Sequence, residues 1–192
     1  MPETPVIHKL SVSALLLVCA LLLALAVRAQ QAPQTYSLIE VEDGDTLIVE
    51  IEGRAERVQL LGIDAPENTE NAKFTLDLQK TGFDPATLLG LGNAAAQYLQ
   101  SLAPAGEALE LQADLQQKDR YGRIPARVFI SSGRDLAEEM ILGGYAVALP
   151  VESMEPAYAE RFDRLERFAR KKGNGLWGSD AQTMNDWYVR TR

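Results

Sequence analysis

The chain has 192 residues, of which 46% are hydrophobic, and a formal net charge of −8 at pH 7. Its only histidine is His8 and its only cysteine is Cys19. Histidine catalysis, a thiol nucleophile, a cysteine zinc site and a disulfide framework are therefore excluded from the rest of the chain. The net negative charge gives little long-range attraction to phosphate, so binding of a nucleic acid would require local positive patches or a metal ion.

The N-terminal segment is apolar from residue 10 to residue 27, with Lys9 before the run and Arg28 after it. This pattern is typical of an export signal within residues 1–29, which predicts a secreted or periplasmic protein. The run is also nearly long enough to cross a bilayer, so a membrane anchor is the alternative. Without this leader, 17 basic and 26 acidic residues remain, a net charge of −9. The polar residues 30–36 are interpreted as a linker.

Residues 41–51 predict two β-strands joined by a tight turn. Apolar residues alternate on both sides of the acidic turn 43–45, in which Gly44 is expected to take a positive φ. Residues 60–63 continue the β pattern as a third strand, and a proline two residues after Asp64 ends that strand.

Four carboxylates therefore come at strand ends and in turns. Like charges brought close together repel unless a cation neutralises them, and a hard divalent ion prefers oxygen ligands. Calcium is the first expectation and magnesium the second, whereas an acidic turn exposed to solvent is the simpler alternative. The four carboxylates belong to Asp43, Asp45, Asp64 and Glu67.

A turn rich in arginine follows later in the chain. It spans residues 118–123, reads Lys-Asp-Arg-Tyr-Gly-Arg, and precedes a strand pattern at residues 126–130. Arg123 is thereby placed beside the sheet, and the planar guanidinium suits a phosphate better than the ammonium of lysine does.

The remaining segments are interpreted as scaffold. Residues 68–91 are expected to form a long loop or a short helix, and residues 180–192 a C-terminal tail. The helix at 155–172 carries basic residues around an apolar stripe of Phe162, Leu165 and Phe168, which is typical of packing on a barrel. Two other helices are predicted at 92–102 and 134–142, and another strand at 107–113.

Taken in order, the Asp43-Gly-Asp-Thr46 turn, the Gly62-Ile-Asp-Ala-Pro-Glu67 segment and the turn ending at Arg123 resemble the staphylococcal-nuclease-like (thermonuclease) family. The Gly173-Asn-Gly-Leu-Trp177 segment resembles that family's C-terminus. The resemblance covers residues 37–179. It implies an α+β, mainly β fold: a five-stranded OB-type Greek-key barrel with three flanking helices, expected to be a monomer.

The resemblance also implies calcium-dependent hydrolysis of DNA or RNA. Glu67 would act as the general base or help to position it, and Arg123 would stabilise the leaving side of the phosphate. Arg120 and Tyr121 are the expected substrate contacts. The metal would be held by Asp45 and Asp64 through their carboxylates and by Ala65 through its backbone carbonyl, with Asp43 supporting these ligands from outside.

One position departs from the family pattern. The family usually has a second arginine on the phosphate five residues before the metal aspartate, and here that position is Gln59. Arg57 is the possible substitute, because strand alternation places it on the same face about 6.5 Å away. An arginine on a transferring phosphoryl group is worth about 10³ to 10⁵ in rate. The alternative to a nuclease is therefore an OB-type module that binds nucleic acid or another ligand without cutting it.

Overall fold

The computed structural model describes residues 34–149, 151–152 and 154–191. The predictions for residues 1–29, including the export signal or anchor at 10–27, lie outside the described residues. Residues 35–192 form one of the two compact units of the chain. Within the described residues, no helix is both long enough and apolar enough to cross a membrane.

Five strands close into a barrel in the order β1, β2, β3, β6, β5, with β5 pairing back to β1. Neighbouring strands are antiparallel except β3 and β6, which are parallel. Closure leaves these strands without a free edge. The strands are β1 (Thr35–Val41), β2 (Thr46–Ile51), β3 (Arg54–Leu60), β5 (Ala108–Gln112) and β6 (Ile124–Ile130), and a separate pair joins β4 (Ile63–Asp64) to β7 (Val147–Ala148).

This architecture confirms the predicted α+β fold with a five-stranded OB-type barrel, but its first strand starts earlier than expected. β1 begins at Thr35, inside the segment interpreted as a linker, and its first residues pair with β5. β6 shows strict alternation, with every second side chain from Ile124 to Ile130 buried. This period of two residues is what the sequence displayed.

The helices are more numerous than the three predicted ones. α3, α4 and α5 correspond to the predicted helices, although α3 starts seven residues earlier than expected, at Pro85. Of the others, α2 falls in the segment left open as a loop or helix, α6 falls just before the expected C-terminal tail, and α7 falls within that tail. The bounds are α2 (Ala72–Thr81), α3 (Pro85–Leu102), α4 (Leu136–Gly143), α5 (Pro156–Lys172), α6 (Leu176–Ser179) and α7 (Ala181–Thr191).

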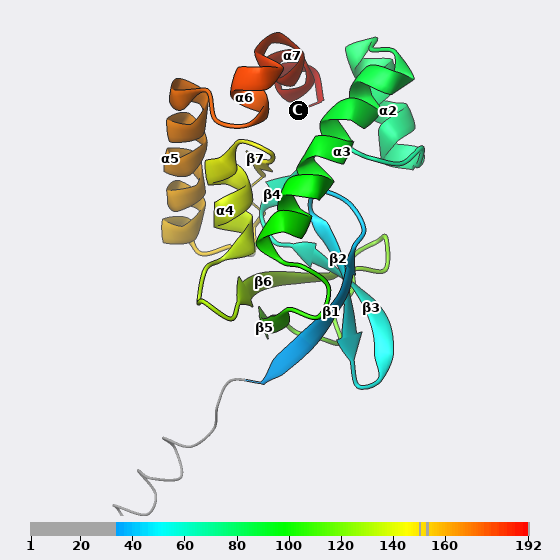
Figure 1. Ribbon diagram of the computed structural model, residues 1–192, viewed down its shortest axis with the longest axis vertical. Coiled ribbons are helices and arrows are strands. Elements are labelled where there is room, and N and C mark those ends of the chain that lie inside the picture. The colour runs from blue at the N-terminus through cyan, green and yellow to red at the C-terminus, as the bar shows by residue number, and fades with distance from the viewer. Residues whose placement is uncertain (1–33, 150, 153, 192) are drawn as a thin grey trace, which may run out of the picture. The chain divides into compact units, whose positions relative to one another are not determined.

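α2 has clear local signals at both ends. The Asn71 side chain caps its first turn by accepting a hydrogen bond from the Phe74 amide, and Gly82 ends it in the left-handed conformation. α7 lies beside α2 (Figure 1), and its Trp187 is fully buried. Packed structure therefore continues to Thr191, beyond the predicted domain end at Ser179.

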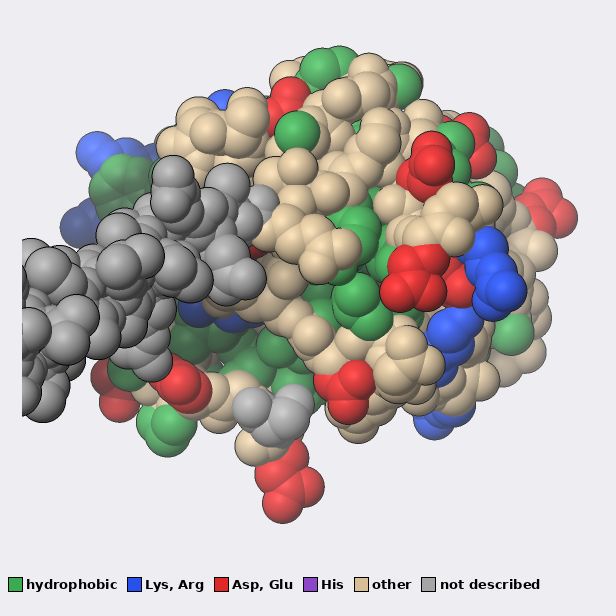
Figure 2. Space-filling model, turned by 90° about the horizontal axis from the view of Figure 1, so that it is seen from below, with side chains coloured by type: hydrophobic (Ala, Val, Ile, Leu, Met, Phe, Trp, Pro, Cys, Tyr) green, Lys and Arg blue, Asp and Glu red, His purple; other side chains and the backbone are tan. Residues whose placement is uncertain are grey.

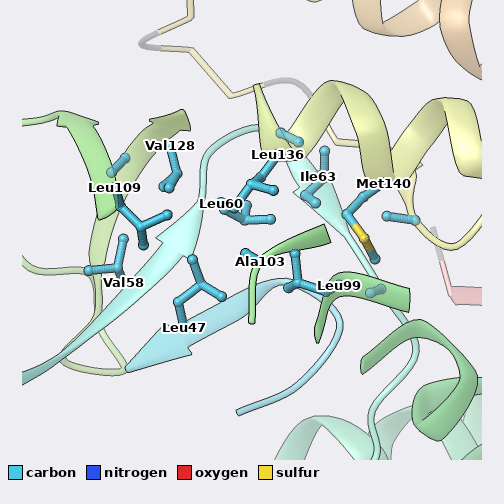
Figure 3. Close-up of a cluster of buried hydrophobic side chains, with 14 of the residues drawn as sticks. Leu47, Val58, Leu60, Ile63, Leu99, Ala103, Leu109, Val128, Leu136 and Met140 are labelled. Carbon is cyan, nitrogen blue, oxygen red and sulfur yellow. The ribbon is translucent and has the colours of Figure 1, made fainter. Parts of the chain in front are cut away.

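The barrel interior is filled by aliphatic side chains from the strands, and helices α3 and α4 close one end of it (Figure 3). A second buried cluster lies among the helices and includes Phe74, Trp177 and Trp187. The side chains labelled in Figure 3 are Leu47, Val58, Leu60, Ile63, Leu99, Ala103, Leu109, Val128, Leu136 and Met140.

The expectation that Gly44 takes a positive φ is wrong, because Gly44 is not among the glycines with that conformation. The reason for glycine here is close packing. A Cβ atom at Gly44 would lie 2.7 Å from the Cβ atoms of Ala65 and Ala95. Likewise, a Cβ at Gly92 on α3 would lie 2.1 Å from the carbonyl oxygen of Glu67. Two glycines therefore let α3 approach both acidic segments closely.

The surface mixes charges of both signs. On the face shown in Figure 2, acidic and basic side chains lie next to one another, with hydrophobic side chains between them. On α5 the arginines pair with nearby carboxylates, as Arg161 does with Glu138 and Arg167 with Asp163. Phe162 is buried as the apolar stripe predicts, but Phe168 is 49% exposed, so the stripe is narrower than expected.

Candidate functional site

The acidic turn between β1 and β2 is locked by its own hydrogen bonds. Asp43 Oδ1 accepts a bond of 2.9 Å from the Asp45 amide, and Asp45 Oδ1 accepts one of 2.9 Å from the Thr46 hydroxyl. Asp45 Oδ2 accepts a third, of 3.2 Å, from the Ala65 amide. This last bond joins the turn to the segment after β4, so the two acidic segments that the sequence separates by about 20 residues meet directly.

Asp45 and Asp64 line the same cavity, which has a volume of about 380 Å³. Gln59 also lines it, and so do Arg120, Tyr121 and Arg123 from the turn before β6. Its other wall is apolar and consists of Leu61, Ile63, Leu149 and Val151. The cavity thus combines carboxylates, guanidinium groups and an apolar surface.

A second, smaller cavity of about 180 Å³ lies next to it, since Lys73, Tyr121 and Arg123 line both. Asp43 and Glu67 line this second cavity, together with Arg57. Arg57 is engaged by Glu42, to which its Nε and Nη2 donate two bonds of 2.6 Å. Arg57, the possible substitute for the missing arginine, therefore lines the smaller cavity, whereas Gln59 lines the larger one. Glu42 balances the charge of Arg57.

Arg123 points into the site. Only 15% of its side chain is exposed, and its Nη1 lies 3.3 Å from the Thr46 hydroxyl and 3.7 Å from Asp45 Oδ1. Its Nε donates to Asp119 Oδ2 at 3.0 Å, which orients the guanidinium plane. The Tyr121 ring is half exposed and lies between two guanidinium groups, 4.8 Å from that of Arg120 and 5.1 Å from that of Arg123.

Sequence reasoning missed Lys73, in the first turn of α2. Its ammonium lies 3.2 Å from Asp64 Oδ1 and 3.2 Å from Glu67 Oε1. The same ammonium donates to the Ala65 carbonyl at 3.2 Å. A signal existed in the spacing of Lys73 and Asp77, which suits an ion pair one helical turn apart. That signal is meaningful only if residues 72–81 form a helix, and this segment was expected to be either a long loop or a short helix.

Burial makes the carboxyl groups of Asp45 and Asp64 hard to ionise. Burial, and next the charge of Asp43, raises the pKa of Asp45 to about 7. Burial also raises the pKa of Asp64 to about 6, although Lys73 opposes the shift. Burial alone would lower the pKa of Lys73, but attraction to Asp64, Glu67 and Asp77 outweighs it and raises that pKa. Loss of hydration is therefore the main obstacle to ionising Asp45 and Asp64, and a bound cation would oppose it.

The donors present fit a hard divalent cation in kind. Asp45 and Asp64 are carboxylates that line the same cavity, and the Ala65 carbonyl follows Asp64 directly in the chain. In the part of the chain that the structure describes, no three acidic, histidine or cysteine side chains are arranged to hold a metal ion. The ion would therefore also need the Ala65 carbonyl and oxygens from water or substrate as ligands.

Fold and site together define a class of protein: a closed OB-type barrel with buried carboxylates and an arginine facing one cavity. Comparison with known proteins agrees. The profile of the family described as "Staphylococcal nuclease homologue" matches residues 57–179, more than half of the chain. The chain belongs to the staphylococcal-nuclease-like family.

Individual relatives cover most of the domain. The chain is 27% identical to a thermonuclease of Staphylococcus hyicus over 76% of this chain and 77% of that protein. It is 28% identical to an uncharacterized endonuclease of Escherichia coli over 81% of this chain and 84% of that protein. An endonuclease of Bacillus subtilis is 26% identical over 75% of this chain, which spans only 11% of that longer protein.

Proposed function

We propose that the protein is a metal-dependent nuclease that hydrolyses phosphodiester bonds of DNA or RNA. The observation that carries the proposal is the shared cavity, in which Asp45 and Asp64 face Arg123. Family membership and the names of the relatives support it. Phosphoryl transfer asks a protein mainly for positioning and for positive charge against the developing negative charge, and this cavity offers both.

Each group has a distinct part in the proposed reaction. Glu67 accepts the proton of the attacking water. Its Oε2 is oriented by a hydrogen bond that the side-chain amide of Asn71 donates. Arg123 donates its free Nη hydrogens to the phosphate on the leaving side. Tyr121 and Arg120 at the rim contact the flanking nucleotides, since a half-exposed ring offers a base a surface to stack on.

The proposed cofactor is Ca²⁺, with Mg²⁺ as the second choice. Asp45, Asp64 and the Ala65 carbonyl would hold it, and Asp43 supports Asp45 by accepting a hydrogen bond from the backbone N–H of Asp45. When bound, the ion supplies positive charge to the phosphate and lowers the pKa of water. Carboxylate and carbonyl oxygens favour these ions over softer metals.

Glu67→Gln tests the role of the base. We expect the change to lower the rate of DNA digestion in Ca²⁺ about 10²- to 10⁴-fold, the range for general-base catalysis, and wild-type digestion to stop in a chelator. The matched control is Glu70→Gln, which alters an exposed carboxylate three residues away and should leave the rate unchanged. Equal rates for the two variants would contradict the assignment of Glu67.

A binding module without catalysis is the second candidate, because Gln59 stands where the family has an arginine and Arg57 is paired with Glu42. Binding of an oligonucleotide without cleavage at any Ca²⁺ concentration would favour it. We further propose that residues 10–27 export the protein to the periplasm or medium, or else anchor it in the membrane. The mass of the mature protein distinguishes removal of the leader from retention.

A further inference from the structure

Lys73 occupies the centre of the acidic site. Its ammonium is surrounded by four oxygens at hydrogen-bond distance, although an ammonium has only three hydrogens to donate. One of these oxygens belongs to the last residue of β4, two belong to the short segment that follows β4, and the fourth belongs to α2 itself. The four are Asp64 Oδ1, the Ala65 carbonyl oxygen, Glu67 Oε1 and Asp77 Oδ2, each 3.2 Å from Lys73 Nζ.

The position of this ammonium is set by two helices. Asp77, one turn further along α2, is 2% exposed and accepts a bond of 3.1 Å from the indole nitrogen of Trp187 on α7. The Trp187 ring also lies 5.5 Å from Lys73 Nζ. α7 begins at Ala181, after the end of the family match at residue 179. Lys73 is thus held by a helix pair of which one member lies outside the matched region.

Asp64 and the Ala65 carbonyl are also among the proposed ligands of the divalent ion. An ammonium in contact with both groups repels a divalent cation that approaches the same oxygens, because the two charges have the same sign and would lie only a few ångströms apart. Both cations compete for the same oxygens. The four-carbon stem of lysine is flexible, and Lys73 lines the two cavities, so its ammonium can leave these oxygens without unfolding α2.

We propose that Lys73 is a built-in counter-cation that competes with the divalent ion for Asp64 and the Ala65 carbonyl, and so weakens metal binding. The inference rests on the proposed metal site. Its consequence is a site that keeps its shape without metal and fills only where the divalent ion is abundant. A purely structural ion pair would stabilise α2 as well, but it would not lower metal affinity.

The test compares Ca²⁺ affinity among variants of the full-length protein by isothermal titration calorimetry. We expect Lys73→Met, which keeps the length of the side chain without its charge, to lower the Kd at least tenfold, about 1.4 kcal/mol. Lys73→Arg keeps the charge and should change the Kd less than threefold. Lys80→Met is the matched control on α2, because Lys80 contacts the carbonyl oxygen of Thr191 and none of these carboxylates.

Thermal unfolding in a chelator supplies a second readout. Lys73→Met should melt at a lower temperature than wild type, because its carboxylates lose their cation, and Ca²⁺ should raise its melting temperature more than that of wild type. If Lys73→Met is folded only in Ca²⁺, the inference is supported. If it is unfolded in both conditions, Lys73→Gln takes its place in the titration under the same criterion.

An unchanged or higher Kd in Lys73→Met would overturn the inference. If wild type still needs Ca²⁺ to cleave DNA in that case, the proposed function stands and only the role of Lys73 falls. If neither wild type nor Lys73→Met binds Ca²⁺, the inference falls together with the metal site. Binding by Lys73→Met alone would support the inference in its strongest form.

Discussion

Gln59 is the residue on which the proposed reaction rate depends most. It lines the larger cavity with Asp45 and Arg123, so a side chain at this position faces the place proposed for the phosphate. A glutamine can donate a hydrogen bond there but brings no charge. Arg57 does not replace it directly, because Glu42 engages its guanidinium in the neighbouring cavity.

Gln59→Arg should therefore accelerate DNA digestion. An arginine on a transferring phosphoryl group is worth about 10³ to 10⁵ in rate, and a new one in an unadapted site should recover at least about tenfold. Steady-state digestion of denatured DNA in Ca²⁺ measures the gain. Gln112→Arg, at an exposed position on β5, controls for the added charge alone. Absence of cleavage by both wild type and Gln59→Arg would favour the binding module.

At the scale of elements, α2 and α7 form a unit that supports the site from outside the barrel. Trp187 is fully buried between them, and its indole nitrogen reaches Asp77, which in turn contacts Lys73. A second link joins the helices at their far ends, where Arg190 donates to the Thr81 carbonyl. The position of Lys73 therefore depends on the C-terminal helix.

Trp187→Ala should destabilise the protein by about 3–5 kcal/mol, since it leaves a cavity in a packed cluster and removes a partner of Asp77. Urea denaturation followed by circular dichroism measures the change. Val189→Ala, on the same helix but 62% exposed, should cost less than about 0.5 kcal/mol. Similar losses for the two variants would mean that α7 does not pack on α2 as described.

At the scale of the whole molecule, the effect of an acidic side chain on stability depends on whether the side chain is exposed or buried. On α5 the exposed carboxylates of Glu160 and Asp163 are balanced by arginines, so these ion pairs add little to stability. In the site, Asp45 is buried and Asp64 is mostly buried, and the raised pKa values of these two carboxyl groups mean that ionising them costs folding free energy. The stability of the molecule should therefore depend on pH through the site.

In a chelator, the free energy of unfolding should fall as the pH rises from about 4 to about 7. The folded state holds protons on Asp45, whose pKa burial raises to about 7, and on Asp64, whose pKa burial raises to about 6, whereas the unfolded state releases them near the ordinary aspartate value of 3.8. Folded protein thus binds more protons than unfolded protein in this window, so the free energy of unfolding falls with pH, in total by on the order of a few kcal/mol. Urea denaturation at each pH measures it.

Calcium and Asp45→Asn provide the comparison for this slope. Saturating Ca²⁺ should flatten it, because the ion stabilises the ionised carboxylates, and Asp45→Asn in chelator should flatten it because one of the two groups no longer titrates. A free energy of unfolding that rises with pH across the same window in chelator would contradict the assignment.

Much of the fold follows from local patterns in the sequence. The alternation in residues 124–130 and the helical period of residues 156–172 act over a few residues, so the chain displays them directly. The acidic turn and the arginine turn could likewise be predicted, because turn residues and a proline that ends a strand act on their immediate neighbours. These patterns predicted strands, helices and turns, whereas the barrel was expected from the resemblance of the turns to the staphylococcal-nuclease-like family. Of the expected site residues, Asp45, Asp64 and Arg123 line the larger cavity.

Tertiary packing decided the rest. The residues next to Gly44 and Gly92 in the sequence do not predict that a helix packs closely on both acidic segments. The atoms that would clash with a Cβ there come from distant parts of the chain. The central place of Lys73 has the same origin. Its neighbours in sequence supply the carboxylates, but the docking of α2 on α7 determines where the ammonium lies. Interactions between distant segments have no period in the sequence, so only the folded structure reveals them.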